Sequence, residues 1–432
     1  MKKEEKKKVC IITLGCKVNQ YESDTLGEAL EEMGHAVSHK LCEADIYVLN
    51  SCAVTNEAER KSRQMIAKFN KLNPRCKIFV CGCASQNNPS QFTELENVRF
   101  VIGNGNILSL IDNLAKKGKK VTKHTETYDT PGLTKPSLTR GYVKIQDGCN
   151  RYCSYCLIPF LRGPSRSRDI VSILKEIQTL IDGGVQEIVL AGVDVSDYKI
   201  DGELALLKLM QEINKFNVRF RLSSFEPNIL TKEFVTEISK LENLCPHFHI
   251  SMQSGSTSVL KRMNRHYTSE FFVERVKLLR KYFRNCAITT DIIVGFPSES
   301  DAEFEETIST VKKCKFSHMH VFPYSRRSGT ACDKMIARKD ENFKLIDGKV
   351  VKARVSKLIE IGKNFEKDFL KKQIGKKLEV VIEEKKGEFF ASTSRNYVKV
   401  YIPNADKNLT GIHTVKIKKL HHDGVLGCLI EK

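Results

Sequence analysis

The sequence alternates short apolar runs with helical patterns, and this alternation limits the possible fold more than any other feature. From Lys8 to about Lys119, four runs are rich in β-branched residues and end at small residues, which is typical of buried strands. They are KVCIITLG, ADIYVLNS, KIFVCG and VRFVIG. Between them, YESDTLGEALEEMG and NEAERKSRQMIAKFNKL have helical spacing. Such alternation predicts a parallel sheet covered on both faces, so we expect an α/β domain over residues 1–119.

A second series of strand and helix patterns begins at Arg140, after a polar stretch that we interpret as a linker. Its strand patterns are GYVKIQ, EIVLAGVD, RFRLSSFEP, HFHISMQSG, ITTDIIVGFP and MHVFPYS. Helical patterns such as IVSILKEIQTLIDGG lie between them. Six strand–helix units in series predict a complete or partial (β/α) barrel over residues 140–368, with functional loops at the carboxyl ends of its strands. A long amphipathic helix then leads out of this part of the chain.

The chain changes character from Phe369 onward. Five short alternating segments are separated by turn signals, which predicts a small antiparallel β-barrel of the OB type over residues 369–432. This part holds 13 lysine and arginine residues against seven acidic residues. A small basic barrel joined to an α/β body favours binding of nucleic acid. The alternative is a domain that only caps the main body.

The composition limits the compartment and the partner. The whole chain has a net charge of +19, which favours a nucleic acid as partner over a merely solvated basic surface. No apolar run reaches the roughly 18 residues that a membrane span needs, so we expect no membrane association. The 15 cysteines are odd in number and the chain starts MKKEEKKK without a signal peptide, so we expect the cytoplasm. Clustered cysteines in a reducing compartment indicate metal or redox chemistry.

Three cysteines lie within eight residues in the segment GCNRYCSYC, at Cys149, Cys153 and Cys156. The segment follows the first strand pattern of the predicted barrel, on the face where such folds keep their active sites. Three such thiolates bind three irons of a [4Fe–4S] cluster and leave the fourth iron open to a substrate. A structural zinc site uses four ligands, and a distant residue would have to complete it here. The C-x₃-C-x₂-C spacing therefore favours iron–sulfur over zinc, and core cysteines are the remaining alternative.

Three more cysteines directly follow strand patterns of the first series: Cys16 in ITLGC, Cys52 in VLNSC and Cys83 in VCGC. The carboxyl ends of parallel strands open on one crevice, so these three thiols are expected to converge there. A small apolar residue also suits a strand end, which is the alternative for any single cysteine. Three in register favour a second cluster. Cys81 lies two residues before Cys83, and only one of the two can be the third ligand.

The C-x₃-C-x₂-C loop after the first strand of a repeating βα domain resembles that of the radical S-adenosylmethionine enzymes. The resemblance implies that Cys149, Cys153 and Cys156 each bind one iron, and that S-adenosylmethionine occupies the fourth iron through its amine and carboxylate. Reduction by the cluster would then cleave the sulfonium and release a 5′-deoxyadenosyl radical, so that the cofactors carry the hard chemistry.

The whole chain resembles the methylthiotransferases, which join a three-cysteine domain, a radical S-adenosylmethionine domain and a TRAM domain. The motifs that carry the resemblance are TLGCKVNQYES, NSCAVTNEAERKSR, VKIQDGCNRYCSYCLIP, HISMQSGS and TTDIIVGFPSES. The form GCKVNQYES resembles the branch that acts on threonylcarbamoyladenosine in tRNA, whereas sister branches act on isopentenyladenosine or on a ribosomal protein aspartate. One departure is CGCASQ, where the family usually has an aromatic residue after the cysteine. We take Cys83 as the ligand because it follows Gly82 as in the family.

The resemblance implies that a methylthio group replaces hydrogen at carbon 2 of the modified adenosine beside the anticodon. It implies two [4Fe–4S] clusters, one held by Cys16, Cys52 and Cys83, and a second S-adenosylmethionine that methylates sulfur on this first cluster. The partners would be tRNA, whose target base is splayed out, and a reductant protein that donates electrons. We expect the chain to act as a monomer. A non-catalytic, metal-stabilised RNA-binding protein is the alternative of another class.

Several other residues are candidates on weaker grounds. Four of them sit at predicted strand ends facing the proposed site and are candidate contacts of S-adenosylmethionine: Gly192, Gln253, Ser254 and Gly295. Tight turns explain the glycines equally well. The arginines of LRGPSRSRD suit a carboxylate or phosphate, or else an ordinary salt-bridged loop. Histidines alternate on the later strands of the second series, and we expect hydrogen-bonded barrel residues there rather than ligands. They are His247, His249, His318 and His320.

Overall fold

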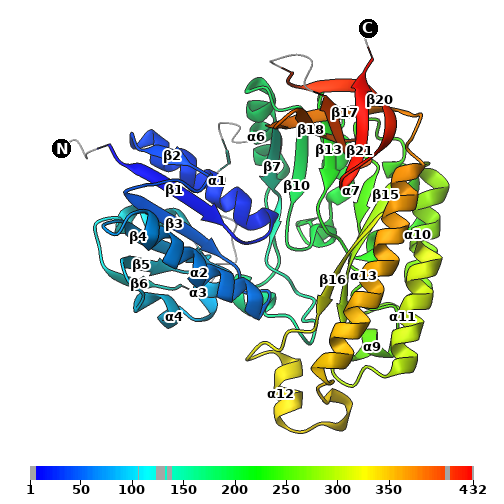
Figure 1. Ribbon diagram of the computed structural model, residues 1–432, viewed down its shortest axis with the longest axis horizontal. Coiled ribbons are helices and arrows are strands. Elements are labelled where there is room, and N and C mark those ends of the chain that lie inside the picture. Colours follow the sequence, from blue (N-terminus) through cyan, green and yellow to red (C-terminus); the bar gives the residue numbers. More distant parts are fainter. Residues whose placement is uncertain (1–5, 106, 123–131, 134–138, 404–408, 431–432) are drawn as a thin grey trace.

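The computed structural model describes residues 6–105, 107–122, 132–133, 139–403 and 409–430. Three parts follow one another along the chain (Figure 1). A parallel sheet with its helices lies beside a central ring of strands and helices, and a small β-barrel sits at one end of that ring. Within the described residues, no helix is both long and apolar enough to cross a membrane.

The N-terminal part is a six-stranded parallel sheet in the order β2-β1-β3-β4-β5-β6. Its strands are β1 Lys8–Thr13, β2 Ala36–Ser38, β3 Ile46–Ser51, β4 Lys77–Gly82, β5 Val98–Ile102 and β6 Gly118–Lys120. The four strands expected from the sequence are present. The short edge strands β2 and β6 were not expected, because β6 is an exposed Gly-Lys-Lys segment without an apolar pattern, held by backbone pairing with β5. Strand β6 falls inside the polar stretch AKKGKKVTKHTETYDTPGLTKPSLT that we interpret as a linker, so the linker begins later than the sequence indicates.

Helices cover both faces of this sheet, and a hydrophobic core lies on each face. They are α1 Lys17–Glu32, α2 Asn56–Leu72, α3 Cys83–Asn87 and α4 Ser90–Thr93. Helix α2 is a polar segment with an apolar residue every three to four positions. The Thr55 side chain caps its start by accepting a hydrogen bond from the Ala58 amide. The doubly covered parallel sheet confirms the expected α/β class.

The central part holds the six expected strands in two three-stranded sheets, β13-β10-β7 and β14-β15-β16. The strands are β7 Arg140–Lys144, β10 Glu187–Ala191, β13 Arg219–Leu222, β14 His247–His249, β15 Ala287–Val294 and β16 His318–Pro323. Isolated parallel bridges join the two sheets beside β13 and β14. Within the described residues no pairing joins β7 to β16, so the barrel is partial, as the sequence allowed. Helices on its outside include α6 Ile170–Asp182, α7 Leu206–Ile213, α8 Lys232–Ile238, α10 Ser269–Tyr282 and α11 Asp301–Cys314.

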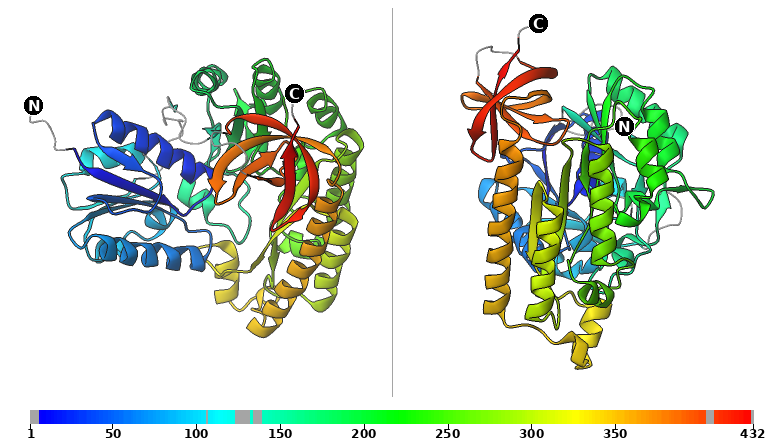
Figure 2. Two further views of the ribbon diagram at one scale, coloured as in Figure 1. Left: turned by 45° about the horizontal axis from the view of Figure 1, so that its top comes forward. Right: turned by 90° about the vertical axis from the view of Figure 1, so that its right-hand side faces the viewer.

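The C-terminal part is a closed barrel in the strand order β17-β18-β19-β21-β20. Its strands are β17 Lys377–Lys386, β18 Phe389–Ser394, β19 Lys399–Pro403, β20 Ile412–His421 and β21 Gly424–Leu429. All neighbours are antiparallel except β19 and β21, an order that fits the expected OB-like fold. Helix α13, Gly348–Lys371, runs along the central part and leads into this barrel (Figure 2).

The C-terminal barrel is fixed to the amino ends of the central strands. Arg219 and Arg221 of β13 donate hydrogen bonds to the carbonyls of Thr393 and Ser394 at 2.8 and 3.2 Å. The ring of Tyr397 stacks on the ring of His247 with 4.0 Å between centroids. The loops at the carboxyl ends of the same strands therefore lie away from this contact.

Candidate functional site

The cysteines of the N-terminal sheet lie at the ends of three adjacent strands. Cys16 caps the start of α1 after β1, Cys52 directly follows β3, and Cys83 is the first residue of α3 after β4. Because β1, β3 and β4 are neighbours in a parallel sheet, these ends lie on one edge. Burial, together with the nearby Cys83 and Cys16 thiols, raises the pKa of Cys52 to about 11. The three thiols are thus close enough to interact electrostatically.

Cys81 occupies a different place from Cys83. It belongs to the hydrophobic core on one face of the sheet, whereas Cys83 belongs to the core on the other face. The Cys81 thiol donates to the carbonyl of Leu49 at 3.6 Å. Between them, Gly82 has φ +98°, and a Cβ there would lie 2.4 Å from the Ser51 carbonyl oxygen. Only glycine fits this turn, which directs the Cys83 side chain toward Cys16 and Cys52.

Two nitrogen donors point at the sulfur atoms of this group. The Val54 amide donates to Sγ of Cys52 at 3.5 Å, and the Asn104 side chain donates to Sγ of Cys83 at 3.3 Å. Asn104 follows β5, so a fourth neighbouring strand also contributes at this edge. Hydrogen bonds to sulfur stabilise a metal-bound thiolate and tune the potential of an iron–sulfur cluster.

The second group of cysteines forms a loop after the short strand β8, Gln146–Asp147. Gly148 has φ +73°, and a Cβ there would lie 1.9 Å from the Pro164 carbonyl oxygen, so glycine is required at this turn. Cys149, Cys153 and Cys156 are each partly exposed. Burial raises the pKa of Cys149 and of Cys156 to about 12 in the metal-free protein. Binding of iron replaces those protons.

Each thiol of the loop accepts a hydrogen bond from nitrogen. The Arg151 amide donates to Cys149 at 3.5 Å and the Ile158 amide donates to Cys156 at 3.4 Å. The guanidinium of Arg265 donates to Cys153 at 3.4 Å. Arg265 is itself held by Glu226 at 2.7 Å. Three soft thiolate donors, each with an N–H partner, fit a [4Fe–4S] cluster with one open iron.

Among the described residues, no three His, Cys, Asp or Glu side chains surround a single metal-ion position. A [4Fe–4S] cluster does not need such a position, since each of its cysteines binds a different iron. The six cysteines therefore stay the predicted cluster ligands.

The two cysteine groups are joined through one hydrophobic wall and one buried ion network. Leu157 and Leu161, which follow the loop, share a core with Cys83. Arg162, at the end of helix α5 (Ile158–Arg162), pairs with Glu22 of α1 at 2.8 Å and with Asp147 of β8 at 3.1 Å. Arg166 also pairs with Asp147, and Arg168 pairs with Glu176. The arginines of LRGPSRSRD therefore form a salt-bridged loop, which was the alternative to binding a carboxylate or phosphate ligand.

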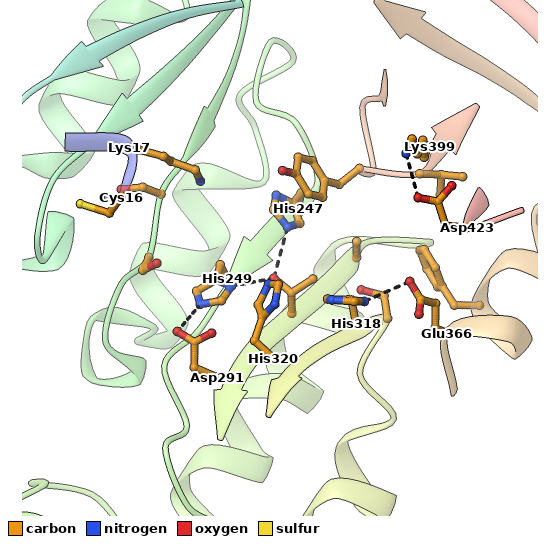
Figure 3. Close-up of a pocket in the computed structure, with 18 of the residues that line it drawn as sticks. Cys16, Lys17, His247, His249, Asp291, His318, His320, Glu366, Lys399 and Asp423 are labelled. Atoms are coloured by element: carbon orange, nitrogen blue, oxygen red, sulfur yellow. Dashed lines mark hydrogen bonds and ion pairs between the residues drawn. The ribbon is translucent and has the colours of Figure 1, made fainter. Parts of the chain in front are cut away.

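A cavity of about 730 Å³ connects the three parts of the chain (Figure 3). Cys16 and Lys17 from the N-terminal part line it, as does Gly192 after β10. The inner wall of the central barrel contributes histidines from β14 and β16 together with Asp291 of β15. Residues of α13 and of the C-terminal barrel complete it. This volume suits a nucleoside-sized ligand, and the cavity places that ligand beside the Cys16 group.

Three of the four histidines of this cavity are hydrogen-bonded barrel residues, as expected. His320 differs, since among the described residues it has no hydrogen bond and its ring lies 4.7 Å from that of His318. His249 bonds to Thr289 at 2.9 Å and to Asp291 at 3.1 Å, and His318 bonds to Glu366 at 3.0 Å. His247 is buried, and this burial lowers its pKa well below the usual value, so the ring stays neutral. The expectation missed that these rings line a cavity.

The four candidate cofactor contacts lie in different surroundings in the structure. Gly192 lines the cavity. Gln253 has φ +63° and its backbone pairs with β15, donating to the Asp291 carbonyl at 2.9 Å. Ser254 is buried, and its hydroxyl lies 3.4 Å from that of Thr307. Gly295 has φ +72° and packs against Val351, so a turn and a close contact account for this glycine. A cofactor role of these four residues stays a prediction.

Three residues of the site were missed by reasoning from the sequence. Asn104 stands at a strand end, in the sequence VIGNG, and the same rule that selected the cysteines would have found it. Lys17 lies beside Cys16, and this position next to a candidate ligand is its only indication in the sequence. Arg265 is 112 residues from Cys153, and nothing in its local sequence indicates the contact.

Family models match two separate stretches of the chain. Residues 143–311 match the family model described as "Radical SAM superfamily", and residues 8–103 match "Uncharacterized protein family UPF0004". Among solved structures, the radical S-adenosylmethionine methyltransferase TsrM from Kitasatospora setae superposes with a TM-score of 0.57 at 14% identity, covering 78% of each chain. At this identity the likeness shows a shared fold.

Curated relatives match over most of the chain. The "Threonylcarbamoyladenosine tRNA methylthiotransferase MtaB" of Bacillus subtilis is 36% identical and covers 95% of this chain and 94% of its own. The "tRNA-2-methylthio-N(6)-dimethylallyladenosine synthase" of Syntrophus aciditrophicus is 35% identical and covers 79% of this chain and 77% of its own. With its two groups of three cysteines in place, the chain belongs to the methylthiotransferase family of radical S-adenosylmethionine enzymes.

Proposed function

We propose that this chain adds a methylthio group to carbon 2 of N6-threonylcarbamoyladenosine next to the anticodon of tRNA. Relatives whose names state this activity match along almost its full length. The enzymes of this family use S-adenosylmethionine and two [4Fe–4S] clusters. When bound, these cofactors supply the radical that activates the C–H bond and the sulfur and methyl group that replace the hydrogen.

Six cysteines are the proposed ligands of the clusters. Cys16, Cys52 and Cys83 would hold the first cluster at the edge of the N-terminal sheet. Cys149, Cys153 and Cys156 would hold the radical cluster in the loop after β8. The N–H donors at five of these sulfurs support the assignment, because such bonds stabilise bound thiolates. The buried Arg162 network would keep the two sites in a fixed relation.

The proposed division of labour follows the three parts of the chain. Residues 1–119 would present the sulfur site, residues 140–368 the radical site, and residues 369–432 would hold tRNA. The observation that carries the proposal is the cavity, since it is lined from all three parts and includes Cys16. A base splayed out of the anticodon loop would enter it and lie against the first cluster.

The decisive experiment incubates the reconstituted protein with reductant, S-adenosylmethionine and tRNA carrying either threonylcarbamoyladenosine or isopentenyladenosine. Nucleoside mass spectrometry then measures the methylthio products. We expect a product from threonylcarbamoyladenosine in large excess over the other. Methylthiolation of isopentenyladenosine, or of a ribosomal protein peptide, would assign the chain to a sister branch. Failure to cleave S-adenosylmethionine under reduction would instead favour a non-catalytic RNA-binding protein.

Three finer expectations stay predictions. They are that the chain acts as a monomer, that it works in the cytoplasm, and that a separate reductant protein donates its electrons. Light scattering of the free protein and of its tRNA complex tests the first of them.

A further inference from the structure

Lys17 is a cation in the cavity wall that has no counterion among the described residues. It is the first residue of α1, directly after Cys16, and its side chain extends toward His247 (Figure 3). Within the described part of the chain it has neither a hydrogen bond nor an ion pair. A half-buried ammonium group that lacks a partner loses solvation without compensation. An anion that enters the cavity would compensate for the lost solvation.

The other charged side chains of the cavity are already paired. Asp291 bonds to His249 at 3.1 Å, Glu366 to His318 at 3.0 Å, and Asp423 to Lys399 at 2.7 Å. Each carboxylate of the wall therefore has its own partner. Lys17 remains as the lysine that a ligand can neutralise.

The substrate under the proposed function carries a matching group. A threonylcarbamoyl substituent ends in a carboxylate, whereas an isopentenyl substituent is uncharged. Both leave the adenine ring and carbon 2 unchanged, so a cation near the N6 substituent distinguishes the two without touching the reacting atom. Removing a charged hydrogen-bond partner from a partly buried site weakens binding about tenfold or more.

We propose that Lys17 binds the carboxylate of the threonylcarbamoyl group and thereby selects tRNA with an acidic N6 substituent. This subsite rests on the proposed function, because it assumes that the target adenosine enters the cavity. It makes Lys17 a specificity-determining residue, adjacent to the first cluster but not part of it.

The test measures binding of anticodon stem-loop RNAs that differ only in having threonylcarbamoyladenosine or unmodified adenosine at the target position. We expect the wild type to prefer the modified RNA by about tenfold or more. Lys17→Gln should abolish the preference and leave binding of the unmodified RNA as it was, which also shows that the variant is folded. Lys17→Arg should retain part of it. Lys399→Gln, a lysine of the same cavity that is already paired, is the matched control and should keep the preference.

Iron content and the cluster spectrum of each variant complete the test. A Lys17→Gln variant that loses iron or shifts the spectrum, yet keeps the RNA preference, would make Lys17 a partner of the cluster and overturn the proposal. A wild type that forms the methylthio product but shows no binding preference would also overturn it, with the proposed function intact. If the wild type modifies neither RNA, the proposed function itself fails.

A second, independent feature is a basic groove next to the cavity, between the ends of α10 and α13. Its cations are Arg280, Arg284, Lys315, Lys371, Lys372 and Lys376, against one carboxylate, Asp368. Among the described residues none of the six is in an ion pair. Ser317 and Phe369 line both the groove and the cavity, so the two are continuous.

The geometry points to this groove as a binding site for the sugar–phosphate backbone of the tRNA anticodon arm. A row of unpaired cations along one groove attracts a polyanion and carries no sequence information. Its continuity with the cavity would let the backbone lie in the groove while the splayed base lies inside. The groove belongs mainly to the central part of the chain, so RNA contact would extend beyond the C-terminal barrel.

The salt dependence of RNA binding tests this site. In the triple variant Arg280→Gln/Arg284→Gln/Lys315→Gln, which changes the groove cations of the central part, the slope of log Kd against log salt should fall by about two to three. The matched control removes three exposed lysines of α2, as Lys61→Gln/Lys68→Gln/Lys71→Gln, and should keep the slope. An unchanged slope in the first variant would overturn the proposal. Slower reduction by an electron-donor protein with unchanged RNA binding would also overturn it and assign the groove to that protein.

Discussion

Glu22 of α1 and Arg162 of α5 form a two-point ion pair across the junction of the N-terminal sheet and the central barrel. Nη1 lies 2.8 Å from Oε1 and Nη2 lies 3.2 Å from Oε2. Arg162 is only 1% exposed. Arg162 also pairs with Asp147, which Lys144 and Arg166 share. Loss of Glu22 would leave these three cations around Asp147 as an excess of buried positive charge, which is costly in the protein interior.

We therefore expect Glu22→Gln to lower the free energy of unfolding by about 3–5 kcal/mol. Urea denaturation of the cluster-free protein measures the change. The exposed pair of Glu57 and Arg60, three residues apart on α2, is the control, and Glu57→Gln should cost less than about 1 kcal/mol. Equal effects of the two substitutions would show that the buried pair has no special part in the junction.

The two cysteine groups should hold separate clusters. After anaerobic reconstitution, we expect about eight irons and as many acid-labile sulfides per chain, since each [4Fe–4S] cluster holds four. The triple variant Cys149→Ala/Cys153→Ala/Cys156→Ala should retain about four of each. A fall to none would mean that the N-terminal cysteines bind no cluster. Zinc in place of iron would exclude radical chemistry.

Cys83 and Cys81 provide a sharper test of the first cluster. Both are buried and lie two residues apart, but on opposite faces of the sheet. Cys83→Ala should lower the iron content of the first site, because an alanine leaves one iron without its protein ligand. Cys81→Ala removes a thiol from the core and should leave the iron content as it was. The reverse result would make Cys81 the ligand and would contradict the geometry around Gly82.

The sequence was sufficient to place the cysteines, because their positions depend on local pattern. Strands β1, β3 and β4 are apolar, β-branched runs, and parallel strands bring their ends to one edge. Alternation alone does not separate Cys81 from Cys83, because residues two apart in a strand share a face. The separation comes from the end of β4 at Gly82, after which Cys83 begins α3. The edge strand β6 could not be predicted, since its backbone pairing leaves no apolar signal in three exposed residues.

The cavity and its charges could not be predicted from the sequence. Glu22 and Arg162 are 140 residues apart, and a charged residue gives no local sign that it will be buried and paired. Lys17 stands out only because every carboxylate near it belongs to another partner, a fact that depends on β14, β16, α13 and the C-terminal barrel together. Lys17 lies in the motif GCKVNQYES, but only the fold shows that it has no counterion among the described residues.

The pair of His318 and Glu366 predicts a pH dependence at the contact of β16 with α13. The hydrogen bond that His318 donates to the Glu366 carboxylate raises the pKa of His318 above its usual value of about 6.5, against the opposing effect of burial. A pKa raised by folding stabilises the protein below the pKa of the unfolded chain, and this contribution is lost as pH rises through the folded value. The side chain of His318 is 43% exposed, so the effect should stay below about 1 kcal/mol.

His318→Gln should therefore lower the free energy of unfolding more at about pH 5.5 than at about pH 8.5, because the stabilising charge of the histidine is lost as the pH rises. Urea denaturation at the two pH values measures the difference. Glu366→Gln should reproduce it, and the double variant should show no further loss at the lower pH, because the two residues act as one pair. A loss that is equal at both pH values would mean that His318 contributes through packing and not through its charge.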